Sequence, residues 1–278
     1  MSIIIIRKST IAEERYTEAF FFKTVVLFLI CVIIIFMRID RLLCELNIGT
    51  RSEVKQLLKK GLVSVNGIKI QKPETQINEQ TDVISYKGRE YKYRPFVYFM
   101  MNKPAGVVSA TEDGHSRTVL DVLTECLKEE LDGNLSGIPI KDIFPVGRLD
   151  KDTVGLLLLT NDGELSHNLL SPKKHVEKCY YVETDLVITD EAANQLENGV
   201  DIGQGQKTRT AIVERLDERK CRITITEGKF HQIKRMFHVV GLKVIYLKRI
   251  SMGSLTLDEN LPEGSVRELT WQEVQRLC

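Results

Sequence analysis

The chain has 278 residues, of which 43% are hydrophobic and 28% are charged. This is the composition of a globular protein, and the length suffices for a sizeable core with a smaller second domain. It excludes a collagen, a disordered tail protein and a disulfide-stapled miniprotein. Six cysteines are scattered without a C-x-x-C pair. Neither a zinc ribbon nor a disulfide framework is therefore indicated, and a reducing cytoplasm is the expected location.

Charge is distributed unevenly along the chain, although the formal net charge is only +1. Residues 37–94 carry 12 Lys and Arg against 7 Asp and Glu, whereas residues 95–278 carry 23 against 28. A basic segment before a mildly acidic body favours an anionic partner that is held by one part of the chain. Chance variation along the chain is the alternative.

The first 36 residues differ from the rest of the chain. Residues 24–36, TVVLFLICVIIIF, form an uncharged apolar run, but a membrane-spanning helix needs about 20 residues. No cleavage site typical of a signal peptide follows this run. We expect residues 1–36 to be upstream sequence and Met37 to be the authentic start. A membrane anchor is the alternative.

The basic segment predicts a small module of two helices and a hairpin. Apolar residues recur at helical spacing from Ile39 to Leu46. Thr50 and Glu53 form a capping box for a second helix, which ends near Gly61. Apolar residues then flank Asn66-Gly67, a strong signal for a two-residue hairpin turn.

Basic side chains gather on or near these two predicted helices. They are Arg38, Arg41, Arg51, Lys55, Lys59 and Lys60. Such a cluster suits phosphate contacts, and RNA helices are recognised largely by shape and backbone; a solvated helix face is the alternative. The segment resembles the S4 RNA-binding domain, with R-[ILV]-D-[RK] at its start and R-x-x-[AV]-x-x-[LI]-[LI]-x-x-G-x-V-x-V-N-G in its middle. The resemblance implies an S4 domain over residues 37–84, followed by a connector over residues 85–96.

The remaining residues, 97–278, predict an α+β domain with a mainly antiparallel mixed sheet and flanking helices. Strands are expected at 97–101, 156–160, 178–188, 211–216, 221–226 and 243–250. Helices are expected at 118–127, 164–170, 190–198 with an Asp190 cap, 230–240, and after a cap formed by Thr270 and Glu273.

A loop carboxylate, Asp150, precedes the apolar strand expected at 156–160, between Gly147 and Gly155. Loops beside buried strands often carry catalytic residues. A loop Asp is still more often a turn former or a helix cap. Its position alone leaves both interpretations open.

The segment GRLDKDTVGLLLLTNDG resembles the catalytic motif of pseudouridine synthases, in the RsuA-like branch. NKPAGVVS, EKCYYV, EGKFHQIKRMF, and LKRISMGSLTL followed by LPEGSVREL agree with the same family. The resemblance implies isomerisation of a specific uridine in ribosomal RNA, foremost 16S rRNA, to pseudouridine, without a cofactor or a metal. A 23S rRNA target and a non-catalytic RNA-binding assembly factor are the alternatives.

The resemblance also implies roles for individual residues. Asp150 is the catalytic carboxylate acting on a flipped-out base, whether it attacks C1′, adds to the base or removes a ribose proton. Lys234, in HQIK, is the cation beside it, and Tyr180 stacks on the uracil and assists proton transfer. Arg148 fills the gap left by the base or holds a phosphate, with a structural salt bridge as the alternative. Arg235 is expected to contact RNA.

Two neighbouring side chains receive no chemical role. Tyr181 points to the opposite strand face from Tyr180 and is expected to pack there, and His231 is expected to be polar or RNA-contacting rather than a general base. No second His or Cys stands at metal-ligand spacing, and no Gly-rich phosphate loop predicts a nucleotide cofactor. We expect a cytoplasmic monomer that binds ribosomal RNA or a ribosomal assembly intermediate, and neither DNA nor a membrane.

Overall fold

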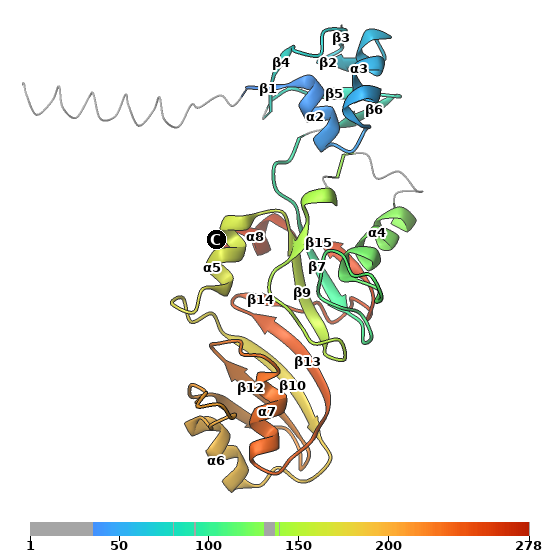
Figure 1. The fold of residues 1–278 in the computed structure, drawn as a ribbon. Coiled ribbons are helices and arrows are strands. Elements are labelled where there is room, and N and C mark those ends of the chain that lie inside the picture. The colour runs from blue at the N-terminus through green and yellow to red at the C-terminus, as the bar shows by residue number, and fades with distance from the viewer. Residues whose placement is uncertain (1–35, 80, 92, 131–136, 139, 278) are drawn as a thin grey trace, which may run out of the picture. The chain divides into compact units, whose positions relative to one another are not determined.

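The computed structural model describes residues 36–79, 81–91, 93–130, 137–138 and 140–277. The apolar N-terminal segment therefore lies outside the described residues, except for Phe36. Contacts divide the described chain into an N-terminal unit, residues 36–44 and 49–93, and a C-terminal unit, residues 45–48 and 94–277 (Figure 1). Within the described ranges, no helix combines the length and the apolar character that crossing a membrane requires.

Both predicted helices are present in the N-terminal unit, as α2 (Ile39–Glu45) and α3 (Arg51–Lys59). The side chain of Thr50 accepts a hydrogen bond from the backbone N–H of Glu53, and the Glu53 carboxylate accepts one from the backbone N–H of Thr50 at 2.8 Å. Side chains thereby satisfy N–H groups that the first turn of a helix leaves free. The predicted capping box is confirmed, and it fixes where α3 begins.

The predicted hairpin follows, with β2 (Val63–Val65) paired to β3 (Ile68–Ile70). Its turn residues, Asn66 and Gly67, have φ angles of 50° and 81°. Positive φ at both central residues is the type I′ geometry, which matches the twist of the paired strands and which Asn and Gly adopt readily. The hairpin is therefore confirmed.

The sheet of this unit is larger than the sequence predicts. β5 (Ile84–Tyr86) pairs with β2, and β6 (Arg89–Tyr91) pairs with β5, so the strand order is β3-β2-β5-β6. A second sheet joins β1 (Phe36–Arg38) to β4 (Gln76–Asn78). The segment 85–96, predicted as a connector, thus supplies strand residues. Strands of three residues are too short to show the alternation that identifies a strand in a sequence.

One mixed sheet extends through the C-terminal unit, with the strand order β11-β12-β10-β13-β9-β7-β15 (Figure 1). Neighbouring strands are antiparallel except β13 and β9, which run parallel. The short strands β14 and β8 pair with β13 and β9. The predicted α+β class with a mainly antiparallel mixed sheet is confirmed. The strands are β7 (Tyr98–Lys103), β8 (Phe144–Pro145), β9 (Val154–Thr160), β10 (Lys178–Thr184), β11 (Ile212–Arg215), β12 (Lys220–Ile225), β13 (Val244–Met252), β14 (Leu255–Thr256) and β15 (Val266–Glu268).

Helices cover both faces of this sheet. Apolar side chains of α4, α6 and α7 pack on the face that holds Tyr180 and Leu247, in the larger core. Those of α5 and α8 pack on the opposite face, with Leu156 and Leu158 of the fully buried strand β9. The helices are α4 (Val119–Glu130), α5 (Gly163–Leu170), α6 (Asp190–Asn198), α7 (Gln232–Val239) and α8 (Trp271–Leu277).

Two helices begin differently from their sequence predictions. The cap of α6 is Thr189, whose side chain accepts a hydrogen bond from the backbone N–H of Ala192 at 3.1 Å, and not Asp190. Helix α7 begins at Gln232 rather than at Phe230, because His231 has a φ of 47°, in the left-handed region. This left-handed residue turns the backbone just before α7, in the segment that faces Asp150.

Candidate active site

The loop between β8 and β9 carries Asp150, and its backbone is held on both sides. Before it, the Ser109 hydroxyl accepts a hydrogen bond from the backbone N–H of Leu149 at 3.1 Å and donates one to the Leu149 carbonyl at 3.0 Å. After it, Gly155 has a φ of +99°, and a Cβ there would lie 2.3 Å from the carbonyl oxygen of Arg249. Only glycine allows β9 to approach β13 this closely.

A fully buried lysine holds the same loop. Lys103, at the end of β7, places Nζ within hydrogen-bonding distance of four carbonyl oxygens, among them those of Asp150 at 3.2 Å and Thr153 at 2.9 Å. Burial lowers the pKa of Lys103 to about 8, although the negative charges of Asp152 and Asp150 act in the opposite direction. The sequence analysis missed this residue. A lysine that ends an apolar strand, in NKPAGVVS, was the available signal.

The Asp150 carboxylate faces a lysine and a histidine from the start of α7. Lys234 Nζ lies 3.4 Å from Asp150 Oδ2, and His231 Nε2 lies 3.5 Å from Asp150 Oδ1. Lys234 also pairs with Asp152 at 2.5 Å, and this hydrogen bond lowers the pKa of the Asp152 carboxyl. The Asp150 side chain is 27% exposed, against 74% for Asp152. Of the two, Asp150 is thus the carboxylate that is shielded from water, as catalysis by an ionised group requires.

One face of the sheet supplies a wall beside Asp150. Tyr180 of β10 and Arg249 of β13 are directly opposite each other in the antiparallel ladder, so their side chains share a face. Lys178 lies two residues before Tyr180 and therefore shares this face as well. All three side chains are buried.

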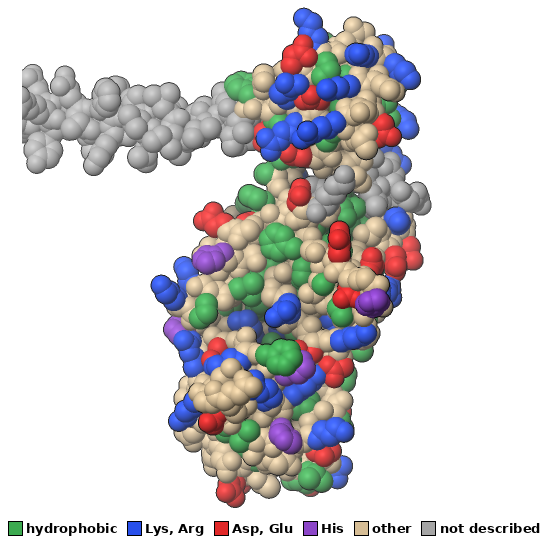
Figure 2. Space-filling model, viewed as in Figure 1, with side chains coloured by type: hydrophobic (Ala, Val, Ile, Leu, Met, Phe, Trp, Pro, Cys, Tyr) green, Lys and Arg blue, Asp and Glu red, His purple; other side chains and the backbone are tan. Residues whose placement is uncertain are grey.

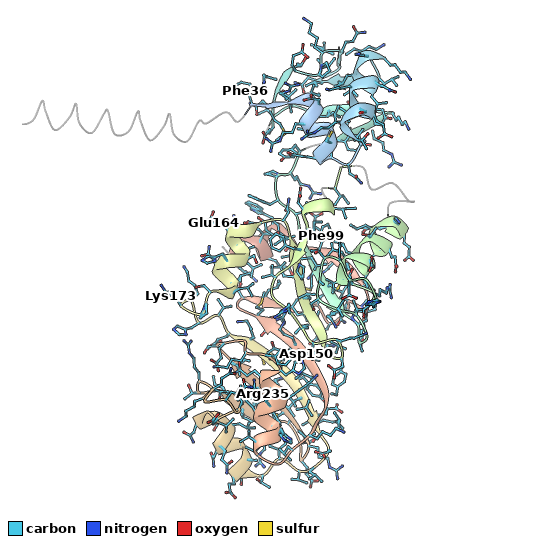
Figure 3. All side chains as sticks on the ribbon, in the orientation of Figure 1. Phe36, Phe99, Asp150, Glu164, Lys173 and Arg235 are labelled. Carbon is cyan, nitrogen blue, oxygen red and sulfur yellow. The ribbon has the colours of Figure 1, made fainter. Side chains whose placement is uncertain are left out.

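A cavity of about 460 Å³ opens between the Asp150 loop, this sheet face and the segment before α7. An adjoining hollow of about 90 Å³ shares Asp150 and Tyr180 and reaches Lys234. The larger volume is typical of sites for small ligands. Figure 3 shows Asp150 in the middle of the C-terminal unit, near α7, which carries Arg235. The cavity is lined by Gly147, Arg148, Leu149, Asp150, Leu170, Ser171, Pro172, Lys178, Tyr180, Thr226, Glu227, Gly228, Lys229, Phe230, His231 and Arg249.

The structure thus brings Asp150, Tyr180, Lys234 and Arg148 together, Arg148 as an exposed side chain of the cavity lining. It does not bring Arg235 there. The Arg235 guanidinium donates to the carbonyl oxygens of Ile202 and Phe230, at 3.0 Å and 3.2 Å, so it holds two protein loops together. This use of its N–H groups differs from the RNA contact expected for it.

Tyr181 lies on the other face of β10 from Tyr180. Its hydroxyl donates to the Glu183 carboxylate, and its ring packs edge-on against Tyr246 with 6.0 Å between the ring centres. Burial raises the pKa of Tyr181 to about 12, and the Glu183 hydrogen bond acts in the same direction. This tyrosine therefore packs outside the cavity, as the alternation of β10 predicts.

The expected RNA-binding cations of the N-terminal unit are distributed around α2 and α3. Lys55, Lys59 and Lys60 are exposed, because Val54 and Leu58 point the apolar face of α3 into the core. Figure 2 shows Lys and Arg side chains spread over the visible surface of this unit. Arg51 is likewise exposed, and so is Arg41, the third residue of α2.

Arg38, in this set, pairs with a carboxylate. Its guanidinium makes two hydrogen bonds to Asp40, at 3.0 Å and 2.8 Å. This bidentate pair raises the pKa of Arg38 and lowers that of the Asp40 carboxyl. Arg38 is therefore less available to a phosphate than the lysines of α3.

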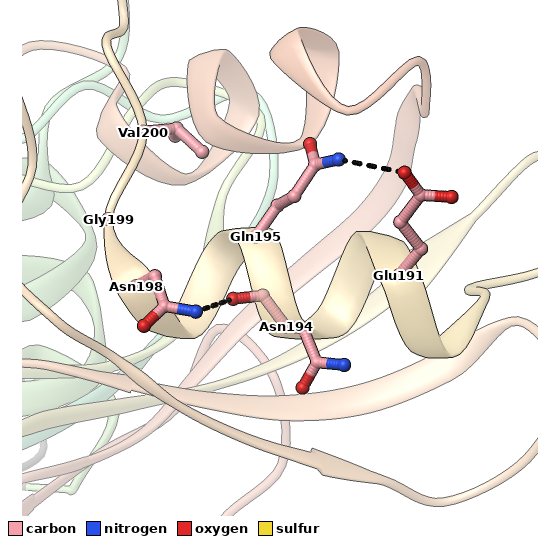
Figure 4. A pocket seen from close by; sticks show the side chains of 6 residues that line it. All are labelled: Glu191, Asn194, Gln195, Asn198, Gly199 and Val200. Atoms are coloured by element: carbon pink, nitrogen blue, oxygen red, sulfur yellow. Dashed lines mark hydrogen bonds between the residues drawn. The ribbon is translucent and has the colours of Figure 1, made fainter.

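A second hollow, of about 590 Å³, lies along α6 and is more open to solvent (Figure 4). Its polar side chains bond within the helix: Gln195 to Glu191 at 3.4 Å, and Asn198 to the carbonyl of Asn194 at 2.8 Å. These side chains are neutral apart from Glu191, so nothing in it matches the charge arrangement around Asp150. In the described part of the chain, no group of three or more His, Cys, Asp and Glu side chains is arranged to hold a metal ion.

Comparison with protein families agrees with this geometry. Residues 97–239 match the RNA pseudouridylate synthase family, and residues 37–84 match the S4 domain. The cavity residues Asp150, Tyr180 and Lys234 all lie within the first match.

Individual proteins give the same result. The chain is 45% identical to the "Uncharacterized RNA pseudouridine synthase YtzG" of Bacillus subtilis, over 87% of this chain and 98% of that protein. It is 41% identical to the "Ribosomal small subunit pseudouridine synthase A" of Vibrio cholerae, over 86% of this chain and 98% of that protein.

A solved structure supports the assignment. A crystal structure of a pseudouridylate synthase, 33% identical, covers 87% of this chain and 100% of its own, with a TM-score of 0.59. The motifs, the fold and these relatives together lead to one assignment. The chain belongs to the RNA pseudouridylate synthase family, as an RsuA-like enzyme with an S4 domain, and is an isomerase.

Proposed function

We propose that the chain converts a uridine of small-subunit ribosomal RNA into pseudouridine, with Asp150 as its catalytic carboxylate. The observation that carries this proposal is a carboxylate, 27% exposed, that lies 3.4 Å from Lys234 in a cavity walled by Tyr180. The relatives named for the small ribosomal subunit support 16S rRNA as the target, and the S4 domain supports an RNA partner. A ribosomal substrate goes with a cytoplasmic location.

The reaction dictates what the cavity must do. The N1–C1′ bond breaks, the uracil turns, and C5 bonds to C1′ instead. A stacked base gives a protein no access to these atoms, so the uridine has to be flipped into the cavity. The Tyr180 ring offers a surface for the uracil, and its hydroxyl can move a proton. Arg148, exposed beside the cavity, can fill the gap that the base leaves or hold a phosphate.

Asp150 needs a negative charge in each of its three possible roles, whether it attacks C1′, adds to the base or removes a ribose proton. The ammonium group of Lys234 supplies a positive charge 3.4 Å from one oxygen of this carboxylate. Lys103 holds the backbone of the same loop and so fixes where the carboxylate lies. Preorganised charge of this kind reduces the reorganisation required during the reaction.

The test of this role compares two variants from one loop. Asp150→Asn keeps the shape of the side chain and removes its charge, so we expect pseudouridine formation to fall by about 100-fold or more, with folding and RNA affinity nearly unchanged. Asp152→Asn removes a charge that the same Lys234 contacts, at an exposed position, and should have a much smaller effect. Turnover by Asp150→Asn near the wild-type rate contradicts the proposal.

The target is tested separately. Pseudouridines of 16S and 23S rRNA are mapped in cells with the gene, without it, and with the Asp150→Asn form. We expect one 16S position to lose its pseudouridine in the second and third strains. Loss at a 23S position instead would assign the enzyme to the large subunit and leave the role of Asp150 standing.

A further inference from the structure

Two buried cations on the cavity floor have no acidic partner among the residues that the structure describes. Arg249 is 2% exposed and Lys178 is 9% exposed, and both line the cavity that holds Asp150. The Arg249 Nε donates to the carbonyl of Leu156 at 2.7 Å, and Lys178 Nζ donates to the carbonyl of Val176 at 2.9 Å. Among the described residues, neither forms an ion pair with a carboxylate. The guanidinium atom Nη2 of Arg249 is buried without any hydrogen-bond partner.

Such an arrangement is unfavourable in the empty protein. A buried donor without an acceptor destabilises the protein, and the cost is larger when the group is charged. Burial, with the charge of Arg249 as a second cause, also lowers the pKa of Lys178. The two cations therefore give this part of the cavity a positive charge, which an oxygen acceptor of a ligand would offset.

Exposure within the cavity indicates which part of an RNA reaches this floor. Phe230 and His231, whose rings stack 3.9 Å apart, are 72% and 43% exposed and form the rim. Exposure falls from this rim to Asp150, at 27%, and further to Tyr180 and Arg249, at 8% and 2%. The phosphates of a flipped nucleotide connect it to its neighbours, so they have to stay near the rim. The base is the free end of the nucleotide, and it is the part that can reach the floor.

We infer that Arg249 is a further catalytic residue, whose guanidinium group donates to a carbonyl oxygen of the flipped uracil and stabilises the negative charge that forms on this base. The inference rests on the proposed function of the cavity. Its position fits, because Arg249 is directly opposite Tyr180 in the β10–β13 ladder, beside the ring proposed to stack on the uracil.

Charge develops on uracil by every route open to Asp150. When the N1–C1′ bond breaks, its electron pair stays on the ring and is shared by O2 and O4. When a nucleophile adds to C6 instead, the electrons move toward O4. The pair later forms the C5–C1′ bond, after which C5 loses its proton and N1 gains one, so the product is an isomer. A guanidinium group that is already placed at O2 or O4 forms a stronger hydrogen bond to the negatively charged base than to neutral uridine.

The test is a double-substitution cycle with the full-length enzyme. Its substrates are fragments of the mapped rRNA target that carry uridine, 2-thiouridine or 4-thiouridine at the modified position, because sulfur is a weaker hydrogen-bond acceptor than oxygen. Single-turnover rates are measured for the wild type and for Arg249→Met. We expect one sulfur substitution to slow the wild type by about tenfold or more. The same substitution should slow Arg249→Met no further, and the sensitive position identifies O2 or O4.

Two results of the sulfur substitutions would overturn the inference. One is a wild-type enzyme that is insensitive to sulfur at both positions; the other is an Arg249→Met variant that slows on all substrates by one common factor, as a purely structural arginine would. Methylphosphonates on either side of the target form a third arm. If they, and not the sulfur substitutions, couple to Arg249, the floor binds phosphate and the inference fails.

Controls separate the loss of an Arg249–uracil contact from weaker RNA binding, from misfolding and from failure of the Asp150 role. Arg148→Met, at the exposed edge of the cavity, should weaken RNA binding equally for all three bases and show no coupling to sulfur. If Arg249→Met does not fold, Arg249→Lys replaces it, and the wild-type rates on the three substrates still decide. If Asp150 has no catalytic role, Asp150→Asn will convert the unmodified uridine substrate at a rate near that of the wild type. That measurement does not involve Arg249.

Discussion

Lys103 illustrates how a single residue can link stability to the site. It is fully buried, its Nζ contacts four carbonyl oxygens, and burial lowers its pKa to about 8. The unfolded chain keeps this lysine protonated up to about pH 10.4. Between these two values the unfolded state therefore binds more protons than the folded state, and the contribution of Lys103 to stability rises with pH.

The prediction compares wild type with Lys103→Met in urea-induced unfolding from pH 7 to pH 10. The free energy of unfolding of the wild type should increase relative to that of the variant above about pH 8, and the other titrating groups cancel in this difference. Lys151→Met serves as the control, since that side chain is exposed and donates to the Ser116 hydroxyl. A difference that stays constant with pH would show that Lys103 keeps its proton in the folded state.

The sequence could predict part of the site at this scale. Asp150, Tyr180 and Lys234 each stand in a continuous motif, and the structure brings them together around one cavity system. Lys103 and Arg249 were not predicted as site residues. A sequence shows a cation but not its burial, and burial is what distinguishes these two side chains. Arg235 shows the converse, since its partners, Ile202 and Phe230, are brought to it by the fold.

At the scale of elements, sequence motifs predicted the features whose hydrogen bonds join residues close in the chain. The capping box of α3 and the Asn66-Gly67 hairpin depend on residues that are neighbours in the chain, and both are confirmed. The pair β5–β6 depends on its partner β2 instead, and its three-residue strands carry little signal of their own. The late start of α7 depends on one residue, His231, whose left-handed backbone no spacing rule indicates.

Helix α8 provides a prediction at this scale, because its predicted cap is present and is tied to β15. Thr270 and Glu273 exchange the capping hydrogen bonds, and Arg267 pairs with the Glu273 carboxylate at 2.7 Å and 2.9 Å. The Arg267 hydrogen bond is the main reason why the pKa of Glu273 falls to about 2. A carboxyl whose pKa is depressed by folding stabilises the protein above its unfolded pKa, and this contribution is lost as the pH falls.

We expect Glu273→Gln to lower the free energy of unfolding by about 1–3 kcal/mol at pH 7. The difference from wild type should shrink between about pH 4.5 and pH 2. Trp271, the only tryptophan of the chain, begins α8 and allows this element to be followed by fluorescence. Glu268→Gln is the matched control, because its pair with Arg94 is exposed and such pairs contribute little. Equal effects of the two substitutions would contradict this account of the α8 cap.

At the scale of the whole molecule, basic and acidic residues are concentrated in different parts of the chain. The excess of Lys and Arg lies in residues 37–94, which include the S4 match, and the excess of Asp and Glu lies in the rest. The cavity around Asp150 has charges of both signs, which suits one nucleotide rather than a long stretch of backbone. Composition alone could reveal this asymmetry, but only the fold shows that the lysines of α3 face solvent.

The final prediction therefore concerns RNA binding by the whole enzyme. Replacing Lys55, Lys59 and Lys60 with Gln removes three exposed cations of the S4 domain. If each neutralises one phosphate, binding should weaken for RNAs of any sequence, and the slope of log affinity against log salt concentration should become shallower by about 2. Pseudouridine formation at saturating RNA should change little, because none of the three lines the cavity.

The matched control removes three cations that already have carboxylate partners. Arg215, Lys220 and Arg222 lie on β11 and β12 and pair with Asp190, Asp217 and Glu214. Their replacement with Gln changes the net charge by the same amount as the α3 triple variant, so it separates a local phosphate contact from a general charge effect. Salt titrations of RNA binding should give the wild-type slope for this control and the shallower slope for the α3 variant. Equal slopes for the two triple variants would mean that the α3 lysines are only solvated charges, and that another surface of the enzyme holds the RNA.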